Sequence, residues 1–468
     1  MSRLDPDRLF SPEPRERAIA RELYEGLARV PILSPHGHCE PVWFAEDPAF
    51  PNPAELLIVP DHYIYRMLYS KGVDLDALGI PRADGSRPDT DPREIWQTFA
   101  DHWHLFLGTP TRLWFDHVLV EVLGIEEPLA SENAQAVYDR VDAVLREPGF
   151  RPRALYERFN VEALATTDAA TDRLPHHRAL KDDPWPGRIL PTFRPDAVTD
   201  PSHPAFEAGI ARLAEQAGND LSSFAAYLDA LRERRAFFIS LGATATDHGT
   251  ETPMTLDLDA ASVERLYQGA LKGLLMADEA AAFQAHMLTE MARMSLDDGL
   301  VMQLHAGSMR NHNGALFLSH GFNVGADIPR AANYVDGLKV LLDAVGNDPR
   351  MTLIVFCLDE TVYARELAPL AGHYPALLLG PPWWFHDSPE GMLRFRRQVT
   401  ETAGFFNTAG FNDDTRAFLS IPARHDVARR MDCRYLAELV ADSRLGMDDA
   451  RMLAHECAYG LARRAYRL

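Results

Sequence analysis

Cysteine is scarce in this sequence of 468 residues, and it has no hydrophobic run long enough to cross a membrane. The four cysteines lie far apart and form no CxxC pair, which disfavours a disulfide framework and suits a reducing cytoplasm. No stretch approaches the roughly 18 uninterrupted apolar residues of a transmembrane helix. The first ten residues, charged from the third onward, contain no apolar signal core. We therefore expect a cytoplasmic protein with no membrane partner.

Basic residues are outnumbered by acidic ones. The sequence has 47 Lys and Arg against 68 Asp and Glu, a formal net charge of −21. This balance disfavours nucleic acid and anionic membranes as partners, because both bind basic surfaces. Only four of the basic residues are lysines, and none of these ends a predicted strand. Neither a Schiff-base aldolase nor a two-metal site bridged by a carboxylated lysine is therefore available.

Apolar residues are plentiful and regularly arranged. They make up 46% of the sequence and charged residues 25%, as in ordinary soluble globular proteins. Eight short apolar runs are separated, for the most part, by amphipathic helical patterns, which predicts an α/β fold with parallel strands. The runs are Val30–Leu33, Val161–Ala165, Ile189–Phe193, Ala236–Leu241, Leu300–Leu304, Met351–Leu358, Ala376–Leu379 and Phe405–Phe411. Eight such units favour a distorted (β/α)8 TIM barrel, residues 1–468 forming a single domain, and a doubly wound open sheet is the alternative.

Two regions depart from this alternation. Residues 40–155 form a long insertion after the first strand, with helical patterns over residues 54–72 and 94–107. We expect a helical insertion on the rim of the barrel, and a separate cap is the alternative. Residues 423–468 are predicted to form extra C-terminal helices, a terminal helical layer.

Two histidines, His36 and His38, follow the first predicted strand. Side chains two apart in an extended segment point the same way, so both imidazoles can reach one metal ion. The bare pattern is weak, because 18 histidines in 468 residues give roughly 0.7 such pairs by chance. A second pair, His102 and His104, lies in a helical pattern, where residues two apart diverge and cannot share a metal.

Other predicted strand ends add candidate ligands. His305 closes the fifth run, and Asp413 and Asp414 follow the eighth. A third imidazole and a carboxylate beside the first two histidines would complete a mononuclear site with an open position. A buried structural histidine and a helix N-cap are the alternative interpretations of these residues.

Charged residues gather at the same predicted ends. Asp247 and His248 follow the fourth run, Arg194 follows the third, and Arg310 lies shortly after the fifth. Arginines at a barrel mouth are suited to binding a carboxylate or phosphate, and surface ion pairs are the alternative.

The insertion and the seventh run supply further candidates. Tyr63 beside His62 can exchange a hydroxyl proton, whereas Asp61 alone is explained equally well by a helix start. Trp383 follows the seventh run and can stack on a sugar or pack at the rim. The sixth run ends without a histidine, and the sequence has neither a glycine-rich phosphate loop nor a Gly-x-Ser-x-Gly elbow.

An ordered set of motifs connects these candidates. It consists of His36-Gly37-His38, Asp61-His62-Tyr63 with Arg66, Phe193-Arg194-Pro195-Asp196, Asp247-His248-Gly249, Gln303-Leu304-His305 with Arg310-Asn311, Trp383-Trp384-Phe385, and Asp414-Thr415-Arg416. The set extends over about residues 30–430 and resembles the uronate isomerase (glucuronate isomerase) family of the amidohydrolase superfamily.

This resemblance implies a distorted (β/α)8 barrel and an aldose–ketose isomerase. The implied reaction interconverts D-glucuronate with D-fructuronate, and D-galacturonate with D-tagaturonate, by proton transfer between C2 and C1 through an enediolate. The partners would be small-molecule uronate sugar acids, and we expect a homo-oligomer. The implied cofactor is one divalent metal ion, zinc, bound by His36, His38 and Asp414.

The resemblance also implies which candidate residues are catalytic and which bind the substrate. Asp414 would be the base, Arg416 would stabilise the enediolate, and Tyr63 with His62 would exchange the hydroxyl proton. Asp413 is the alternative base, since the two aspartates are adjacent. The implied substrate-binding residues are Arg194, His305, Arg310, Asp247, His248 and Trp383.

Two rival functions fit parts of the pattern. A mononuclear metal-dependent hydrolase of the same superfamily would use its metal to activate water, but the missing histidine and lysine argue against the usual hydrolase sites. A non-catalytic sugar-acid binder would not need an ordered set of acids and bases. Exchange of the C2 proton of D-glucuronate with solvent distinguishes all three.

Overall fold

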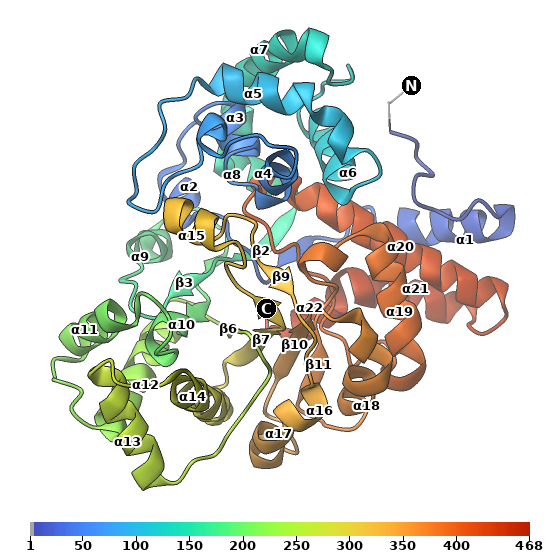
Figure 1. Cartoon of the computed structure of the whole chain (residues 1–468). Helices are drawn as coiled ribbons and strands as arrows, with labels where there is room; N and C mark the ends of the chain where they lie inside the picture. Colours follow the sequence, from blue (N-terminus) through green and yellow to red (C-terminus); the bar gives the residue numbers. More distant parts are fainter. Residues whose placement is uncertain (1–3) are drawn as a thin grey trace.

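The computed structural model describes residues 4–468 as a mixed α/β protein (Figure 1). Strands lie near the centre, a group of helices lies above them in this view, and further helices surround them. Residues 1–3, the start of the segment in which no signal core is expected, lie outside the described residues. No helix of residues 4–468 combines the length and apolarity that a membrane span needs.

The central strands of this part of the chain form two sheets, with the orders β1-β2-β4 and β11-β10-β7-β6-β5-β3. Their bounds are β1 (Ile32–Ser34), β2 (Val161–Ala165), β3 (Asp168–Ala169), β4 (Ile189–Leu190), β5 (Phe193–Arg194), β6 (Ala245–Thr250), β7 (Val301–Ala306), β10 (Leu353–Cys357) and β11 (Leu377–Leu379). Neighbouring strands in both sheets are parallel, as predicted. A short antiparallel pair joins β8 (Ser308–Met309) to β9 (Ile328–Pro329).

Backbone hydrogen bonds extend this series of strands in both directions. Asp168 N donates to Thr192 O at 3.0 Å, where β2 leads into β3 and β4 leads into β5, so the two sheets adjoin. Beyond β11, Leu379 forms a parallel bridge with Thr408. Thr408 lies in the eighth predicted run. Through this bridge, the run pairs with β11 as a strand would.

The same segment returns to the first strand. Asp414 N donates to His36 O at 3.3 Å, and His38 N donates to Thr415 O at 3.0 Å. These two hydrogen bonds bring the residues after the eighth run beside the residues after β1. The start and the end of the strand series therefore meet at the carboxyl ends of the strands.

Six of the eight predicted runs overlap strands. The run Ala236–Leu241 is helical instead, so the prediction of a strand there was wrong. It forms the end of α12 (Phe224–Ser240), in which Phe238 is buried while Ile239 remains 37% exposed. The strand is instead β6, whose Asp247 and His248 interrupt the apolar pattern. A strand that carries polar site residues loses the hydrophobic signal on which the prediction relied.

The insertion is helical and has its own hydrophobic cluster, in which Trp96 and Phe99 are fully buried. Its helices are α2 (Pro41–Glu46), α3 (Pro53–Leu57), α4 (His62–Tyr69), α5 (Pro92–Asp101), α6 (Pro110–His117), α7 (Ala134–Leu145) and α8 (Pro152–Arg158). Proline at the first turn favours several of these helix starts, because its missing N–H is not needed there. The cluster also includes Leu164 of β2, so the insertion packs directly on the strand end.

The remaining helices surround the strands. They are α9 (Pro175–Asp182), α10 (Asp196–Thr199), α11 (Phe206–Ala217), α12, α13 (Ala260–Leu271), α14 (Ala277–Asp298), α15 (Gly314–His320), α16 (Tyr334–Gly337), α17 (Lys339–Val345), α18 (Ala368–Ala371) and α19 (Pro389–Ala403). The C-terminal helices are α20 (Ile421–Ala441), α21 (Met447–His455) and α22 (Leu461–Ala465), and α1 (Pro14–Glu25) packs against α20.

Candidate functional site

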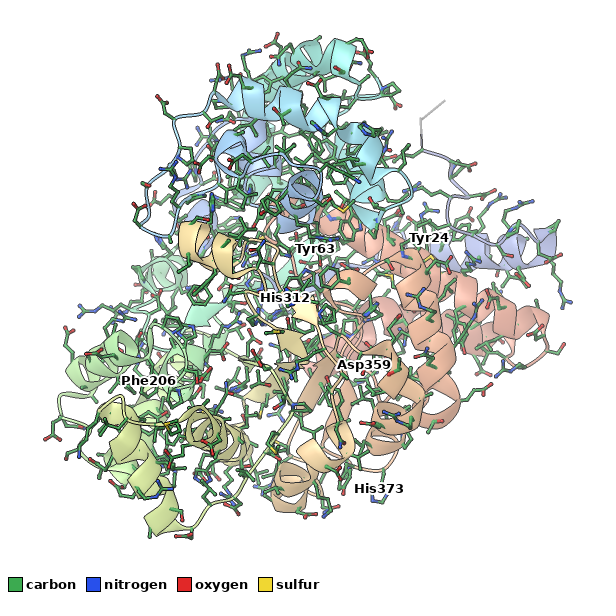
Figure 2. The ribbon with its side chains drawn as sticks, viewed as in Figure 1. Tyr24, Tyr63, Phe206, His312, Asp359 and His373 are labelled. Carbon is green, nitrogen blue, oxygen red and sulfur yellow. The ribbon has the colours of Figure 1, made fainter. Side chains whose placement is uncertain are left out.

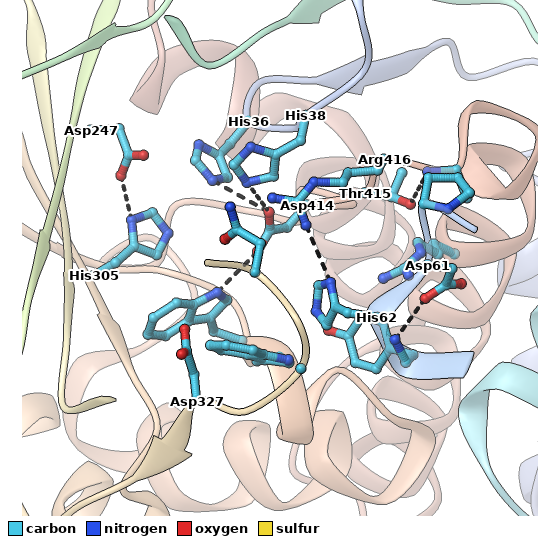
Figure 3. A pocket seen from close by; sticks show the side chains of 18 of the residues that line it. His36, His38, Asp61, His62, Asp247, His305, Asp327, Asp414, Thr415 and Arg416 are labelled. Atoms are coloured by element: carbon cyan, nitrogen blue, oxygen red, sulfur yellow. Dashed lines mark hydrogen bonds and ion pairs between the residues drawn. The ribbon is translucent and has the colours of Figure 1, made fainter. Parts of the chain in front are cut away.

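A cavity of about 770 Å³ lies at the carboxyl ends of the strands, next to the insertion (Figure 3). Of the residues predicted to form the site, those that line it are His36, His38, His62, Tyr63, Arg194, Asp247, His305, Arg310, Trp383, Asp414 and Arg416. They come from seven separate segments of the chain. The structure therefore brings together residues that are up to 380 positions apart in the sequence (36 and 416).

His36 and His38 leave β1 on the same side and point toward the carboxylate of Asp414 (Figure 3). The Nε2 atoms of His36 and His38 lie 3.5 Å and 3.1 Å from Asp414 Oδ1. Burial alone would raise the pKa of Asp414, but hydrogen bonds from the two imidazoles outweigh it and hold that pKa well below its usual range. Burial lowers the pKa of His38 to about 4, so this imidazole is neutral at neutral pH.

The second oxygen of Asp414 is also fixed. Trp383 Nε1 donates to Asp414 Oδ2 at 2.9 Å. The backbone of Asp414 has a φ of 38°, in the left-handed region that non-glycine residues rarely adopt. The orientation of this carboxylate therefore depends on contacts that hold a strained backbone in place.

Asp247, His305 and Arg194 form a second buried group on the adjoining strands. His305 Nδ1 donates to Asp247 Oδ1 at 2.7 Å, and Arg194 Nη1 lies 3.3 Å from Asp247 Oδ2. Burial alone would raise the pKa of Asp247, but the charges of Arg194 and His305 hold it well below its usual range. The His305 ring stacks on His36 at a centroid distance of 4.8 Å, so the two groups adjoin.

The predicted pair His62 and Tyr63 begins α4. Asp61 is the N-cap residue, and its Oδ1 accepts a hydrogen bond from Tyr63 N at 2.8 Å, which fixes where the helix starts. Figure 2 shows Tyr63 at the boundary between the insertion and the rest of the chain. Arg416 Nη1 donates to His62 Nδ1 at 3.2 Å, which ties the insertion to the segment after the eighth run.

Burial sets the protonation states of this pair. Burial and the Arg416 guanidinium hold the pKa of His62 well below its usual range, so its imidazole is neutral. Burial also raises the pKa of Tyr63, so its hydroxyl keeps its proton. The pair therefore presents a neutral hydroxyl and a neutral imidazole to the cavity.

His248 is the predicted site residue that the structure does not bring to the cavity. Adjacent side chains on a strand point to opposite faces, so Asp247 faces the cavity and His248 faces away. His248 Nε2 lies 2.9 Å from Thr246 Oγ1, and burial lowers the pKa of His248 to about 4.

Sequence reasoning missed several residues that line the cavity. Asn323, Gly325 and Asp327 belong to the excursion between β8 and β9. Asp327 Oδ2 accepts a hydrogen bond from Arg310 Nη1 at 3.0 Å, and Asp327 Oδ1 accepts one from Asn311 N. No metal-like or catalytic spacing marks these residues in the sequence, and their position follows from the path of the excursion.

Comparisons with known proteins agree with this arrangement. The sequence model of the glucuronate isomerase family matches residues 15–465. A uronate isomerase of Brucella suis is 57% identical over 465 residues, which cover 99% of this chain and 100% of the relative. A uronate isomerase of Mesorhizobium japonicum is 57% identical over 464 residues, which cover 99% of each chain.

Solved structures give the same result. The crystal structure of glucuronate isomerase from Caulobacter crescentus is 53% identical, with a TM-score of 0.97, and the match covers 99% of this chain and 97% of that chain. The crystal structure of uronate isomerase from Thermotoga maritima is 26% identical, with a TM-score of 0.91 and 99% coverage of both chains.

Proposed function

This chain belongs to the glucuronate isomerase family, and we propose how its residues divide the chemistry of uronate isomerisation among them. The enzyme is an aldose–ketose isomerase that interconverts uronates. The proposed substrate pairs are D-glucuronate with D-fructuronate and D-galacturonate with D-tagaturonate. The observation that carries the assignment of roles is the position of Asp414, whose two oxygens face His36 and His38 on one side and Trp383 on the other.

The reaction imposes three requirements on the site. A base must remove the proton from C2 and return it to C1. The negative charge that develops on the enediolate oxygens must be stabilised. A further group must exchange the proton between the hydroxyl and carbonyl oxygens of C1 and C2. The cavity has candidates for all three.

We propose that one divalent ion, zinc, is bound by His36, His38 and Asp414. One ligand atom from each of these residues lies within 4.8 Å of the others, and two nitrogens with one carboxylate oxygen suit zinc. When bound, the ion would orient and polarise the substrate oxygens at C1 and C2. His36, Asp247 and His305 form a second group of similar size, but the Arg194 guanidinium at Asp247 opposes a second cation there.

Elemental analysis of the purified protein is expected to find one divalent ion per chain. Replacing His38 by Ala removes one of three ligands and is expected to reduce the metal content well below one. The matched control is His104→Ala, which removes a histidine of the insertion that lines no part of the cavity. Two ions per chain, or equal loss of metal from both variants, would contradict the ligand assignment.

Asp414 is the proposed base. Its Oδ2, oriented by the Trp383 indole N–H, would take the proton from C2 and return it to C1. Its low pKa makes it a weak base, so the enediolate must be strongly stabilised for this transfer to succeed. Arg416, two residues further along the chain, lines the same cavity and would supply that stabilisation.

Asp413 is less suited to this role. It is fully buried, it does not line the cavity, and its Oδ2 lies 3.2 Å from His425 Nε2 of α20. These contacts support Asp414 as the reacting carboxylate and give Asp413 a different environment. The adjacent aspartates are therefore assigned separate roles.

Tyr63 and His62 are proposed to exchange the hydroxyl proton. The raised pKa of Tyr63 keeps its hydroxyl protonated, so it can donate a proton to one substrate oxygen. Neutral His62 stacks on the Tyr63 ring at 4.7 Å and is held by Arg416. The insertion thus contributes a proton donor that the strand ends do not provide.

The substrate carboxylate is proposed to bind Arg194. The Arg194 guanidinium lines the cavity and forms ion pairs with Asp196 and Asp247, which fix its orientation. Arg310 is paired with Asp327 and is proposed, together with His305, Asp247 and Trp383, to contact the sugar hydroxyls. Fixed donors of this kind select an acid over a neutral sugar.

Arg194→Met is expected to lower kcat/KM for D-glucuronate by about 10- to 100-fold, because a charge-assisted hydrogen bond contributes roughly 1.5–3 kcal/mol. Steady-state kinetics with D-glucuronate measures this change. Arg310→Met provides the comparison, since it removes a cavity cation that is held by a single carboxylate. An unchanged kcat/KM for Arg194→Met would exclude this arginine from the substrate site.

We also propose that the strands close into a distorted (β/α)8 barrel. The bridge between Leu379 and Thr408 and the hydrogen bond from Asp414 N to His36 O support closure, because they link the last strand to the eighth run and that run to β1. The barrel end with the carboxyl ends of the strands would carry the site, as is usual for this architecture. A cytoplasmic location is supported by four cysteines that are all free and buried.

The decisive experiment incubates the protein with D-glucuronate in D₂O and follows the C1 and C2 protons by NMR. If one base acts on one face of the enediolate, we expect a ketose to form in which part of the original C2 proton is found at C1. A hydrolase would leave the C2 proton in place, and a sugar-acid binder would give neither exchange nor product. Either result would reject the isomerase assignment.

A further inference from the structure

The segment that carries Asp414 has no regular secondary structure to hold it. Residues 411–416 lie outside any helix or strand, and Asp414 itself has a left-handed backbone. The hydrogen bond from its N–H to His36 O is long, at 3.3 Å. Since the left-handed region is unfavourable for a non-glycine residue, other contacts must fix this conformation.

Two consecutive residues of α20 supply such contacts. Arg424 Nη1 donates to Asp413 O at 3.2 Å, and His425 Nε2 donates to Asp413 Oδ2 at 3.2 Å. The carbonyl of Asp413 and the N–H of Asp414 belong to one planar peptide group. Holding the Asp413 carbonyl in place therefore restricts φ of Asp414, and this restricts the direction of the Asp414 carboxylate.

Arg424 also joins two other parts of the site. Its Nη1 donates to Asp387 Oδ2 at 2.7 Å, and Asp387 follows the segment that carries Trp383. Its guanidinium lies 3.7 Å from the ring centroid of Trp114 and 5.3 Å from that of Tyr63, both in the insertion. One buried cation thus contacts the segments of the proposed base, of its indole partner and of the proposed proton donor.

Burial of this ion pair is costly. The Arg424 and Asp387 side chains are only 2% and 6% exposed, and desolvating two charges often costs more than their attraction returns. Contacts with Trp114 offset part of this cost through the cation–π interaction. An apolar pair would stabilise the fold as well, but it would offer no donor to the Asp413 carbonyl.

We propose that Arg424 and His425 are positioning residues that orient the carboxylate of Asp414 for metal binding and proton transfer. The inference rests on the proposed function, because it takes Asp414 as ligand and base. Arg424 lines the cavity and His425 does not, and neither residue touches the reacting atoms in this scheme. Their effect passes through Asp413, and this gives the buried member of the aspartate pair a definite role.

The test compares Arg424→Met with Arg396→Met in the full-length protein. Arg396 is a matched control, because it is a buried arginine paired with Asp432 of α20 but does not line the cavity. Thermal unfolding measures stability, competition with a chromogenic chelator measures zinc affinity, and steady-state kinetics gives kcat and KM. Both variants are expected to lower Tm.

Arg424→Met alone is expected to weaken zinc affinity and lower kcat, each by about 10- to 100-fold, with a smaller change in KM. Arg424→Lys keeps the charge near Asp387 but lacks the planar fork, so it is expected to restore Tm more than kcat. The proposal is overturned if Arg424→Met keeps wild-type zinc affinity and kcat, or if Arg396→Met shows the same losses.

His425 provides a second test that does not depend on folding of the arginine variant. His425→Gln keeps an N–H donor near the position of Nε2, whereas His425→Phe keeps the ring shape without a donor. Zinc affinity and kcat are expected to be largely retained in the first and reduced in the second. Equal values in both variants would overturn the role of His425. If the wild-type protein binds no zinc or lacks isomerase activity, the proposed function fails instead.

Discussion

Asp414→Asn is expected to abolish measurable turnover, a loss of at least about 10⁴-fold in kcat, because it removes the proposed general base and a charged ligand of the proposed metal ion. The amide keeps the size of the side chain and can still accept a hydrogen bond from Trp383 Nε1, so the fold is expected to survive. Circular dichroism checks folding, elemental analysis checks metal content, and single-turnover kinetics with D-glucuronate measures the remaining proton transfer.

Asp413→Asn is the control for this experiment. Its amide oxygen can still accept from His425 Nε2, and its carbonyl contact with Arg424 is unchanged. Because both contacts are kept, we expect kcat to fall by no more than about tenfold, the lower end of the range for residues that act on a ligand indirectly. If Asp413→Asn were inactive while Asp414→Asn turned over normally, the base would be Asp413.

Arg416→Met is expected to lower kcat by about 10²–10³-fold with a smaller effect on KM, because Arg416 is the proposed stabiliser of the enediolate and removing one preorganised oxyanion donor costs roughly 2.7–4 kcal/mol in the transition state. Its guanidinium contacts neutral His62, so its positive charge is available to the developing enediolate. Arg416→Lys keeps a charge but loses the fork geometry and is expected to recover part of kcat. Steady-state kinetics on both variants measures how the loss divides between kcat and KM.

A large rise in KM with an unchanged kcat would contradict this role. In that case Arg416 would bind the substrate equally in the ground state and the transition state. Tyr63→Phe serves as a comparison, since it removes a hydroxyl beside His62 and leaves the positive charge of Arg416 in place. It is expected to slow turnover and leave substrate affinity nearly intact.

Apolar patterning predicted the strands that consist almost wholly of apolar residues. The run Val161–Ala165 coincides with β2, and Met351–Leu358 contains β10, in which every residue is buried. The pattern failed at Ala236–Leu241, because the end of α12 has a short run of apolar residues of which only some are buried. It missed β6, because polar residues interrupt the apolar pattern of that strand, and one of them, Asp247, lines the cavity.

Local spacing likewise predicted part of the site. The separation of His36 and His38 predicted that their side chains point the same way, since the geometry of an extended segment is fixed over two residues. Their choice as candidate ligands also needed His305 and Asp414 at other strand ends.

Asp327 could not be predicted in this way, because its position depends on how the excursion between β8 and β9 folds back over the strand ends. Arg424 could not either, because α20 also contains Arg429, Arg430 and Arg434, and no sequence pattern distinguishes one of these arginines from another.

The meeting of His36 and Asp414 also has a consequence for biosynthesis. A growing chain cannot complete the proposed zinc site until residues beyond 414 have left the ribosome, and α20 must then dock to hold Asp413. An ion that binds only the finished fold stabilises it by mass action, by about 4 kcal/mol at a thousandfold excess over Kd. Under the proposed zinc assignment, zinc supply would thus affect the stability of newly made molecules in addition to their activity.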